Sequence, residues 1–372
     1  MGIELTLEGV TKKYGEVTAV NSLTFTVKSG ELFALLGPSG AGKSTTINLI
    51  AGIEKTEVGE IRVGGKSINE LRPQERDFAM VFESYALYPH MTVEDNIAFP
   101  LRAPVRATRY TAQEIKRRVA ETALMLEIGE LLQRYPKELS GGQKQRVGLG
   151  RALVRDSQLF LLDEPIAHLD AKLRHHMRGE LKRLQKKSGR TTVLATPDYS
   201  EVVAMADRAG VFNHGVIEQI GTPIELFTQP KNVVVAQAIG EPPINLLDCE
   251  IGSRDGQLAI NGAGFSVACN KKMTSLLRSE AAGAQVILGI RPSEITITRD
   301  RAQGLIHGEI YVFEPLGGEA VATVSVQGKL VKVLCPWSAN LHIGDPVSLS
   351  FDLDMVHVFH RDTGRALTPD RA

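Results

Sequence analysis

One short stretch has the residues and the spacing of a phosphate-binding loop: Gly37-Pro38-Ser39-Gly40-Ala41-Gly42-Lys43-Ser44-Thr45. It fits the pattern G-x-x-x-x-G-K-[ST], whose glycines let backbone N–H groups curl round a phosphate. Lys43 supplies a positive charge, and Ser44 offers a hydroxyl to Mg²⁺. The alternative is a glycine-rich turn with a chance lysine, which the neighbouring residues disfavour. We therefore predict a phosphate site that uses Mg²⁺.

Two predicted strands would position this chemistry. An apolar run over residues 32–36 predicts a buried strand entering the loop, and residues 45–51 predict a helix leaving it. A second apolar run, residues 159–162, ends at Asp163 and Glu164. Because ligands bind at the carboxyl ends of parallel strands, Asp163 can hold Mg²⁺ while Glu164 faces an attacking water. An isolated Asp-Glu pair is ordinarily a solvated turn, but its place after a phosphate loop favours the catalytic interpretation.

Other candidate residues carry weaker signals. Tyr14 could stack on a purine, although a single tyrosine beside a turn is more often a surface aromatic. His175 and His176 lie in a polar stretch without metal-spaced partners, so we expect them to be solvated. A further motif is the run Ser140, Gly141, Gly142 and Gln143. Its serine can cap the start of a helix, and its two glycines leave backbone N–H groups open to an anion.

Length and composition limit the class of protein. A chain of 372 residues predicts two domains, and 43 basic against 43 acidic residues disfavour a nucleic-acid partner. The three cysteines, Cys249, Cys269 and Cys335, lack CxxC spacing, which predicts reduced thiols in a cytosolic protein. No apolar run approaches the about 18 residues of a membrane helix. Membrane association is therefore expected to come through partners.

The order of patterns predicts an α/β fold followed by an all-β domain. Short strands over residues 3–36 predict an antiparallel β-subdomain around a P-loop core, and a helical insertion is expected at about 84–150. Within it, Thr111 to Glu114 form a capping-box pattern, followed by one apolar face with Ile115, Val119, Ala123 and Leu126. Gly221-Thr222-Pro223 predicts a helix start. We expect a domain over 1–240 and an OB-like β-barrel over 241–372.

Taken together, these residues resemble the ATP-binding subunits of ABC transporters. The resemblance covers essentially the whole chain and rests on Tyr14, the phosphate loop and residues 139–143, 159–164 and 167–170. Residues 80–91 resemble the MalK-like branch that serves carbohydrate and polyol importers. The run Leu288-Gly289-Ile290-Arg291-Pro292 resembles the TOBE barrel of that branch.

The resemblance implies a role for each motif. Tyr14 would stack on the adenine of ATP, Ser44 and Asp163 would hold Mg²⁺, and Glu164 would be the general base. The loop beginning at Ser140 would act across a head-to-tail dimer on ATP held by the partner, with Asp170 at the dimer seam. The phosphates would be held by Gly37, Pro38, Ser39, Gly40, Ala41, Gly42, Lys43, Ser44 and Thr45.

The resemblance also implies partners and a location. The expected partners are two integral membrane permease subunits, whose coupling helix would enter a groove lined by residues 84–100, and an extracytoplasmic substrate-binding protein. The chain would be cytoplasmic and peripheral on the inner face of the cell membrane.

Two positions depart from the family. Glu83 stands where the family has a glutamine, and Pro197 stands where it has a histidine. Glu83 keeps an acceptor for Mg²⁺ but loses a donor for water, whereas Pro197 has neither a side-chain donor nor a backbone N–H. We therefore expect the chain's own site to bind ATP and hydrolyse it slowly, while Ser140 completes the site of a second, different ATPase. Glycerol importers are the first systems to compare; neutral drift, with Glu164 sufficient alone, is the alternative.

Two readings from other classes stay open at this point. One is a soluble ABC ATPase acting in DNA repair or translation, without a membrane partner. The other is an ATP-sensing regulator whose barrel captures a control protein or a small molecule. Residues 244–372 lack a dense basic and aromatic face, which disfavours a nucleic-acid partner for the barrel.

Overall fold

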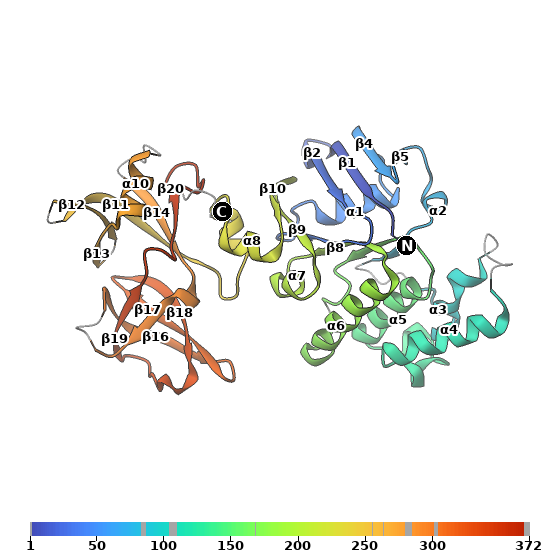
Figure 1. Cartoon of the computed structure of the whole chain (residues 1–372). Coiled ribbons are helices and arrows are strands. Elements are labelled where there is room, and N and C mark those ends of the chain that lie inside the picture. The colour runs from blue at the N-terminus through green and yellow to red at the C-terminus, as the bar shows by residue number, and fades with distance from the viewer. Residues whose placement is uncertain are drawn as a thin grey trace. The chain divides into compact units, whose positions relative to one another are not determined.

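The computed structural model divides into two compact units, residues 1–223 and 224–372 (Figure 1). It describes residues 2–82, 87–103, 110–167, 169–254, 256–262, 264–279, 285–300 and 304–367. This division follows the contacts within the structure, whereas the sequence predicted domains over 1–240 and 241–372. The predicted domain boundary stays a prediction. The described helices include none that is both long and apolar enough to cross a membrane.

The first unit has the predicted α/β core with an antiparallel β-subdomain. In its described part, a six-stranded sheet has the order β10-β9-β3-β8-β7-β6, and a four-stranded sheet has the order β2-β1-β4-β5. The central strands are parallel and buried on both faces, which explains their continuous apolar runs. The strands are β1 (Leu5–Tyr14), β2 (Val17–Val27), β3 (Leu32–Leu36), β4 (Val58–Val63), β5 (Lys66–Ser67), β6 (Ala79–Val81), β7 (Leu159–Asp163), β8 (Thr191–Thr196), β9 (Arg208–Asn213) and β10 (Val216–Gly221).

The predicted helical insertion is present, with one difference in its cap. Val119, Ala123 and Leu126 are buried along one face, as predicted. Thr111 accepts a hydrogen bond from the backbone N–H of Glu114, but the Glu114 carboxylate pairs with two arginines rather than returning to Thr111. The first-unit helices are α1 (Lys43–Ala51), α2 (Pro73–Arg76), α3 (Val93–Arg102), α4 (Ala112–Met125), α5 (Gly141–Leu153), α6 (Ala171–Ser188) and α7 (Tyr199–Met205).

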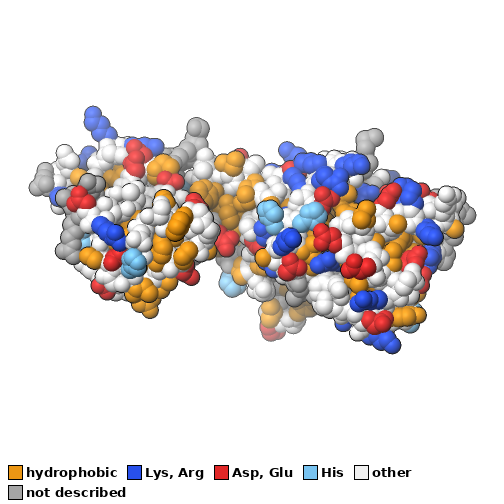
Figure 2. Space-filling model, turned by 90° about the horizontal axis from the view of Figure 1, so that it is seen from below, with side chains coloured by type: hydrophobic (Ala, Val, Ile, Leu, Met, Phe, Trp, Pro, Cys, Tyr) orange, Lys and Arg blue, Asp and Glu red, His pale blue; other side chains and the backbone are white. Residues whose placement is uncertain are grey.

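The outer faces of α4 and α6 carry paired charges. Figure 2 shows acidic and basic side chains lying among one another on one face of the molecule. Arg117 bonds to Glu121 at 2.6 Å on α4, and Arg183 bonds to Glu180 at 2.7 Å on α6. These pairs have the i, i+4 and i, i+3 spacing of neighbours on a helix surface. Arg117 and Arg183 are exposed, so these pairs lie on the solvent side of their helices.

The second unit consists mainly of antiparallel strands. In the part that the structure describes, its sheets have the orders β13-β12-β11-β14-β20 and β15-β19-β16-β17-β18. The sequence predicted the helix start at Pro223 but not the helix α10. The elements are α8 (Pro223–Thr228), α9 (Val233–Ala238), β11 (Asn245–Arg254), β12 (Gln257–Gly262), β13 (Phe265–Ala268), α10 (Lys271–Ser279), β14 (Gln285–Ile290), β15 (Ile295–Thr298), β16 (Ile306–Pro315), β17 (Glu319–Val326), β18 (Lys329–Pro336), β19 (Pro346–Phe351) and β20 (His357–His360).

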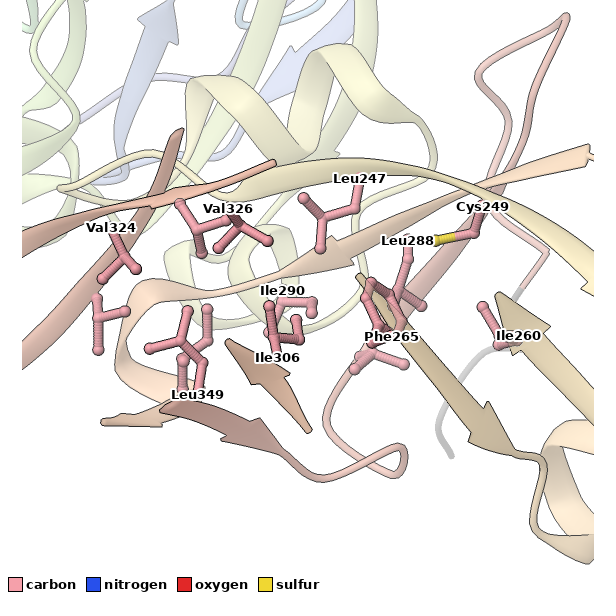
Figure 3. Packing of buried hydrophobic residues seen from close by; sticks show 14 of the residues in the cluster. Leu247, Cys249, Ile260, Phe265, Leu288, Ile290, Ile306, Val324, Val326 and Leu349 are labelled. Atoms are coloured by element: carbon pink, nitrogen blue, oxygen red, sulfur yellow. The ribbon is translucent and has the colours of Figure 1, made fainter. Parts of the chain in front are cut away.

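One apolar core joins the strands of both sheets in this unit. Figure 3 shows Leu288 and Ile290 of β14 in the same cluster as Val324 of β17 and Leu349 of β19. Burying such side chains contributes about 1.5–3 kcal/mol each relative to leaving them exposed. The three cysteines are buried in this unit and are free thiols, in agreement with the sequence.

A buried arginine anchors the end of the helix that follows the phosphate loop. Arg76 is 8% exposed, and its guanidinium donates to the carbonyls of Leu49 and Ile50 at 2.8 and 2.7 Å. It also donates to the carbonyl of Leu71 at 2.9 Å. Carbonyls at a helix C-terminus have no partner within the helix, and a cation there also complements the helix dipole. Arg76 therefore holds α1 at the end opposite to the loop.

We expect Arg76→Met to lower the free energy of unfolding by about 2–4 kcal/mol, because several buried carbonyls lose a charged donor. The control is Arg72→Met in the same segment, whose side chain is 69% exposed and which should change stability by less than about 0.5 kcal/mol. Urea unfolding followed by circular dichroism measures both. Equal losses in the two variants would show that the carbonyl contacts of Arg76 do not matter.

Candidate functional site

The register of the parallel strands brings the predicted motifs to one edge of the sheet. Leu36 pairs with Thr196, and Asp163 pairs with Ala195. The backbone N–H of Gly37 donates to the carbonyl of Thr196 at 3.4 Å. The phosphate loop, the Asp-Glu pair and the turn at Pro197 therefore meet where these strands end. Position 83 follows β6 on the same sheet, but Glu83 itself lies outside the described residues.

The glycines of the loop are required by its backbone. Gly42 has φ +106°, and a Cβ there would lie 2.4 Å from the carbonyl oxygen of Ala19. A Cβ on Gly37 would lie 2.5 Å from the carbonyl oxygen of Phe212. By contrast, a Cβ on Gly40 would meet no atom within 4 Å. The loop is thus packed against the protein on one side and open at Gly40, which fits a cradle for a phosphate.

Polar side chains converge inside and beside this cradle. The Lys43 ammonium donates to the carbonyls of Gly37 and Pro38 at 2.8 and 2.9 Å. The Ser44 hydroxyl donates to Oδ1 of Asp163 at 3.0 Å, and Asp163 is 5% exposed. A hydroxyl and a carboxylate side by side are the oxygen ligands that Mg²⁺ prefers. The described residues therefore fit a magnesium ion beside the loop.

Glu164 occupies an uncommon backbone conformation. Its φ is +46°, in the left-handed region that non-glycine residues rarely adopt. Its N–H donates to the carbonyl of Ala195 at 3.0 Å, and the Gln145 amide donates to its carbonyl at 3.3 Å. Such a conformation costs about 1–3 kcal/mol and persists where the surroundings hold it, often at functional sites. Gln145 was not singled out from the sequence, because its link to Glu164 exists only in the folded chain.

Ser140 caps the N-terminus of α5, as the sequence predicted. Its hydroxyl accepts from the backbone N–H of Gln143 at 3.3 Å, and the side-chain Oε1 of Gln143 accepts from the backbone N–H of Ser140 at 2.9 Å. Ser140 and Gly141 are exposed. Asp170 caps α6 by accepting from the N–H of Leu173 at 2.9 Å, and its side chain is 65% exposed. Their roles across a dimer stay predictions.

The turn at Pro197 is held by its neighbours. The Thr196 hydroxyl accepts from the N–H of Asp198 at 3.0 Å, and the Asp198 carboxylate accepts from the N–H of Ser200 and from Arg178, both at 2.8 Å. Pro197 itself is exposed. The turn is therefore well ordered by hydrogen bonds, yet the residue at its tip contributes no side-chain donor.

A buried acid lies directly after this turn. Glu201 on α7 is 3% exposed, and burial raises its pKa to about 7. A hydrogen bond with Thr196 lowers that pKa, the charge of Asp198 raises it, and Arg178 and Arg174 on α6 lower it. Loss of hydration therefore outweighs the two nearby cations. The burial of Glu201 could not be predicted from the sequence, since a glutamate in the first turn of a helix is usually solvated.

Tyr14 lies at the end of β1, beside the loop. Its hydroxyl forms a hydrogen bond with Thr45, the residue directly after Ser44 of the loop. Burial and the charge of Glu54 raise the pKa of the Tyr14 phenol. The ring remains 46% exposed, so its surface is open to a ligand. The structure thus brings Tyr14 to the phosphate loop, although the two are separated in the sequence.

Comparisons with known families agree with this geometry. A family model described as ABC transporter matches residues 20–167. Two further models, the MalK OB fold domain and the TOBE domain, match residues 240–295 and 288–359.

Curated relatives match over the full length of the chain. The trehalose/maltose import ATP-binding protein MalK of Thermococcus litoralis is 43% identical over 97% of this chain and 98% of its own. The xylose/arabinose import ATP-binding protein XacK of Haloferax volcanii is 42% identical over 98% and 95%. An sn-glycerol-3-phosphate import ATP-binding protein of Rhizobium johnstonii, UgpC 1, is 38% identical over 98% and 96%.

A solved structure has a fold similar to that of part of this chain. The ATP-binding cassette MJ0796, in a dimeric post-hydrolysis state bound to ADP and phosphate, is 31% identical with a TM-score of 0.55. It covers 59% of this chain and 98% of its own.

We expect the stability of this protein to fall as pH rises from about 4.5 to 7, through the titration of Glu201. Its pKa is higher in the folded chain than in the unfolded chain, so ionisation favours the unfolded state. Glu201→Gln should remove this loss. Its free energy of unfolding, relative to that of the parent, should therefore rise by on the order of 2–3 kcal/mol between pH 5 and pH 8. The measurement is urea unfolding at several pH values, with Glu130→Gln as an exposed control. A constant difference between parent and Glu201→Gln at all pH values would contradict it.

Proposed function

Since this chain belongs to the family of ABC transporter ATP-binding proteins, we propose that it energises the import of a sugar, a polyol such as glycerol, or a related small solute. The relatives named above import trehalose and maltose, xylose and arabinose, or sn-glycerol 3-phosphate. In this proposal the chain works on the cytoplasmic face of the cell membrane. It binds two integral permease subunits, and an extracytoplasmic binding protein delivers the solute.

A groove in the helical insertion supports contact with a permease. It has a volume of about 260 Å³ and lies between α3 and α4. Its walls carry the methyl groups of Ala98 and Val119 beside the charged ends of Glu94 and Arg102. An amphipathic helix from a membrane subunit suits such a surface, because it offers an apolar face with polar edges.

The chain's own residues would bind ATP at the edge of the first sheet. The phosphate loop cradles the phosphates with backbone N–H groups and the Lys43 ammonium, and Tyr14 receives the adenine. Ser44 and Asp163, with Glu83 in place of the family glutamine, would hold Mg²⁺. When bound, the metal supplies positive charge that neutralises the phosphate oxygens.

Glu164 would act as the general base for hydrolysis. Its carboxylate takes a proton from a water whose oxygen attacks the γ-phosphorus, and the bond to the β-phosphate oxygen breaks to release ADP and phosphate. The backbone at Glu164, held by Ala195 and Gln145, directs this side chain from the end of β7.

The observation that carries the proposal of a slow site is the position of Pro197. It follows Thr196, whose carbonyl accepts a hydrogen bond from the phosphate loop, so it occupies the edge where the γ-phosphate is expected. A histidine there would donate to the phosphate oxygens, and losing one such contact typically costs on the order of 10² to 10³ in rate. The site should therefore hold ATP and hydrolyse it slowly.

The exposed Ser140 loop supports a heterodimer. Its capping box leaves the loop well formed at the start of α5, where it can reach ATP on a partner. A chain with a weak catalytic edge and an intact loop is suited to pair with a second, different ATPase. In that pair, this chain completes the partner's active site while its own ATP holds the dimer closed.

We expect the purified chain to bind ATP with weak turnover. The double variant Pro197→His with Glu83→Gln should raise the turnover by at least about tenfold, because donors to the phosphate and the water are restored. Phosphate release measures this rate, and adding Glu164→Gln to the double variant should return it to the baseline. Brisk hydrolysis by the unmodified chain as a homodimer would refute the slow site.

In the complex isolated with its second ATPase, two variants of this chain should behave differently. Ser140→Arg places bulk and charge in the loop that serves the partner's site, so it should abolish most ATP hydrolysis. Glu164→Gln affects only the slow site and should leave most of the activity. Steady-state hydrolysis and solute uptake in proteoliposomes measure both, with ATP binding as the control. Equal loss in the two variants would contradict the division of roles.

A further inference from the structure

Lys12, Glu54 and Glu57 form a cluster of charged side chains beside Tyr14, and the proposed chemistry assigns this cluster no role. Lys12 lies two residues before Tyr14 on β1, and its ammonium is 3.2 Å from a carboxylate oxygen of Glu54 and 3.6 Å from one of Glu57. The Lys12 side chain is 13% exposed, and β1 is an inner strand of the antiparallel sheet, between β2 and β4. Both acids come from the segment between α1 and β4, so the cluster joins two parts of the chain.

The same ammonium lies against the ring of Tyr14. Its nitrogen is 5.2 Å from the ring centroid, within the range in which a cation is attracted to an aromatic face. The phenol of Tyr14 is in turn hydrogen bonded with Thr45 and with Glu54. The ring is therefore held at its face by Lys12 and at its hydroxyl by the loop and Glu54.

The backbone keeps the acids in place. The N–H of Lys13 donates to Glu57 at 3.3 Å, and the N–H of Glu57 donates to the carbonyl of Thr11 at 3.2 Å. The N–H of Glu54 donates to the carbonyl of Asn48 near the end of α1. The orientation of Lys12 is thus set by fixed carboxylates rather than by a mobile counter-ion.

We propose that Lys12, held by Glu54 and Glu57, is a positioning residue that fixes the ring of Tyr14 for stacking on the nucleotide base. This inference rests on the proposed function, in which Tyr14 receives adenine. A free tyrosine loses rotamer freedom when a base stacks on it, whereas a ring already held by a cation loses less. Lys12 therefore sets the affinity for the base and leaves the affinity for the phosphates unchanged.

Two ligands separate the base from the phosphates. ATP carries both, whereas inorganic tripolyphosphate carries a phosphate chain without a base. Calorimetric titration of the full chain, with Mg²⁺ present, gives the Kd of each ligand. Tripolyphosphate also reports on folding, because it binds only if the phosphate loop is intact.

We expect Lys12→Met to weaken ATP binding by roughly three- to tenfold and to leave tripolyphosphate binding unchanged. Lys12→Arg, which keeps a cation on the ring, should retain most of the ATP affinity. Lys13→Met is the matched control, since its exposed side chain lies on the same strand, and should change neither Kd.

The outcomes distinguish this inference from the proposed function. If Tyr14→Ala weakens ATP binding and Lys12→Met does not, Lys12 has no positioning role while the nucleotide site stands. If Lys12→Met weakens both ligands equally, its role is structural and the inference is wrong. If Tyr14→Ala leaves the ATP and tripolyphosphate affinities unchanged, the base does not stack on Tyr14, and that part of the proposed function fails together with the inference.

Discussion

The register of three parallel strands is the constraint on which the rest of this structure depends. Leu36 of β3 lies opposite Thr196 of β8, and Asp163 of β7 lies opposite Ala195. Because side chains alternate along a strand, a shift of one residue would turn Asp163 away from the edge that Ser44 reaches. The 3.0 Å hydrogen bond between Ser44 and Asp163 therefore depends on this register. Buried apolar runs on both faces of these strands hold it there.

Around this edge, the site is built largely from backbone conformations that few residues tolerate. The phosphate loop needs glycine at positions 37 and 42 because a Cβ would collide with carbonyl oxygens of neighbouring strands and loops. Glu164 holds a left-handed backbone at the end of β7. Arg76 anchors the far end of α1 through helix carbonyls. The buried core of the unit stabilises these unusual backbone conformations. The sheet thus supports a loop that is open at Gly40.

Local patterns predicted most of the elements of the first unit but missed the helix α10, and they failed where long-range contacts decide. The phosphate loop, the Ser140 cap, the Pro223 helix start and the buried face of α4 each depend on residues within one or two turns. Two contacts join segments that are far apart in the chain: Gln145 with Glu164, and Lys12 with Glu54. The burial of Glu201 likewise depends on the packing of the folded chain. The half-formed cap at Thr111 shows a local competition, since arginines on α4 attract the Glu114 carboxylate.

The pairing of a weak catalytic edge with an intact serine loop is the central claim about function. This proposal rests on one proline at the tip of a well-ordered turn and on an exposed loop at the start of α5. The most direct test is a single-turnover count of phosphate released per complex after both sites are loaded with ATP. The account predicts a burst of one phosphate, with the second ATP retained by this chain and released as product far more slowly. A burst of two phosphates at one rate would contradict it.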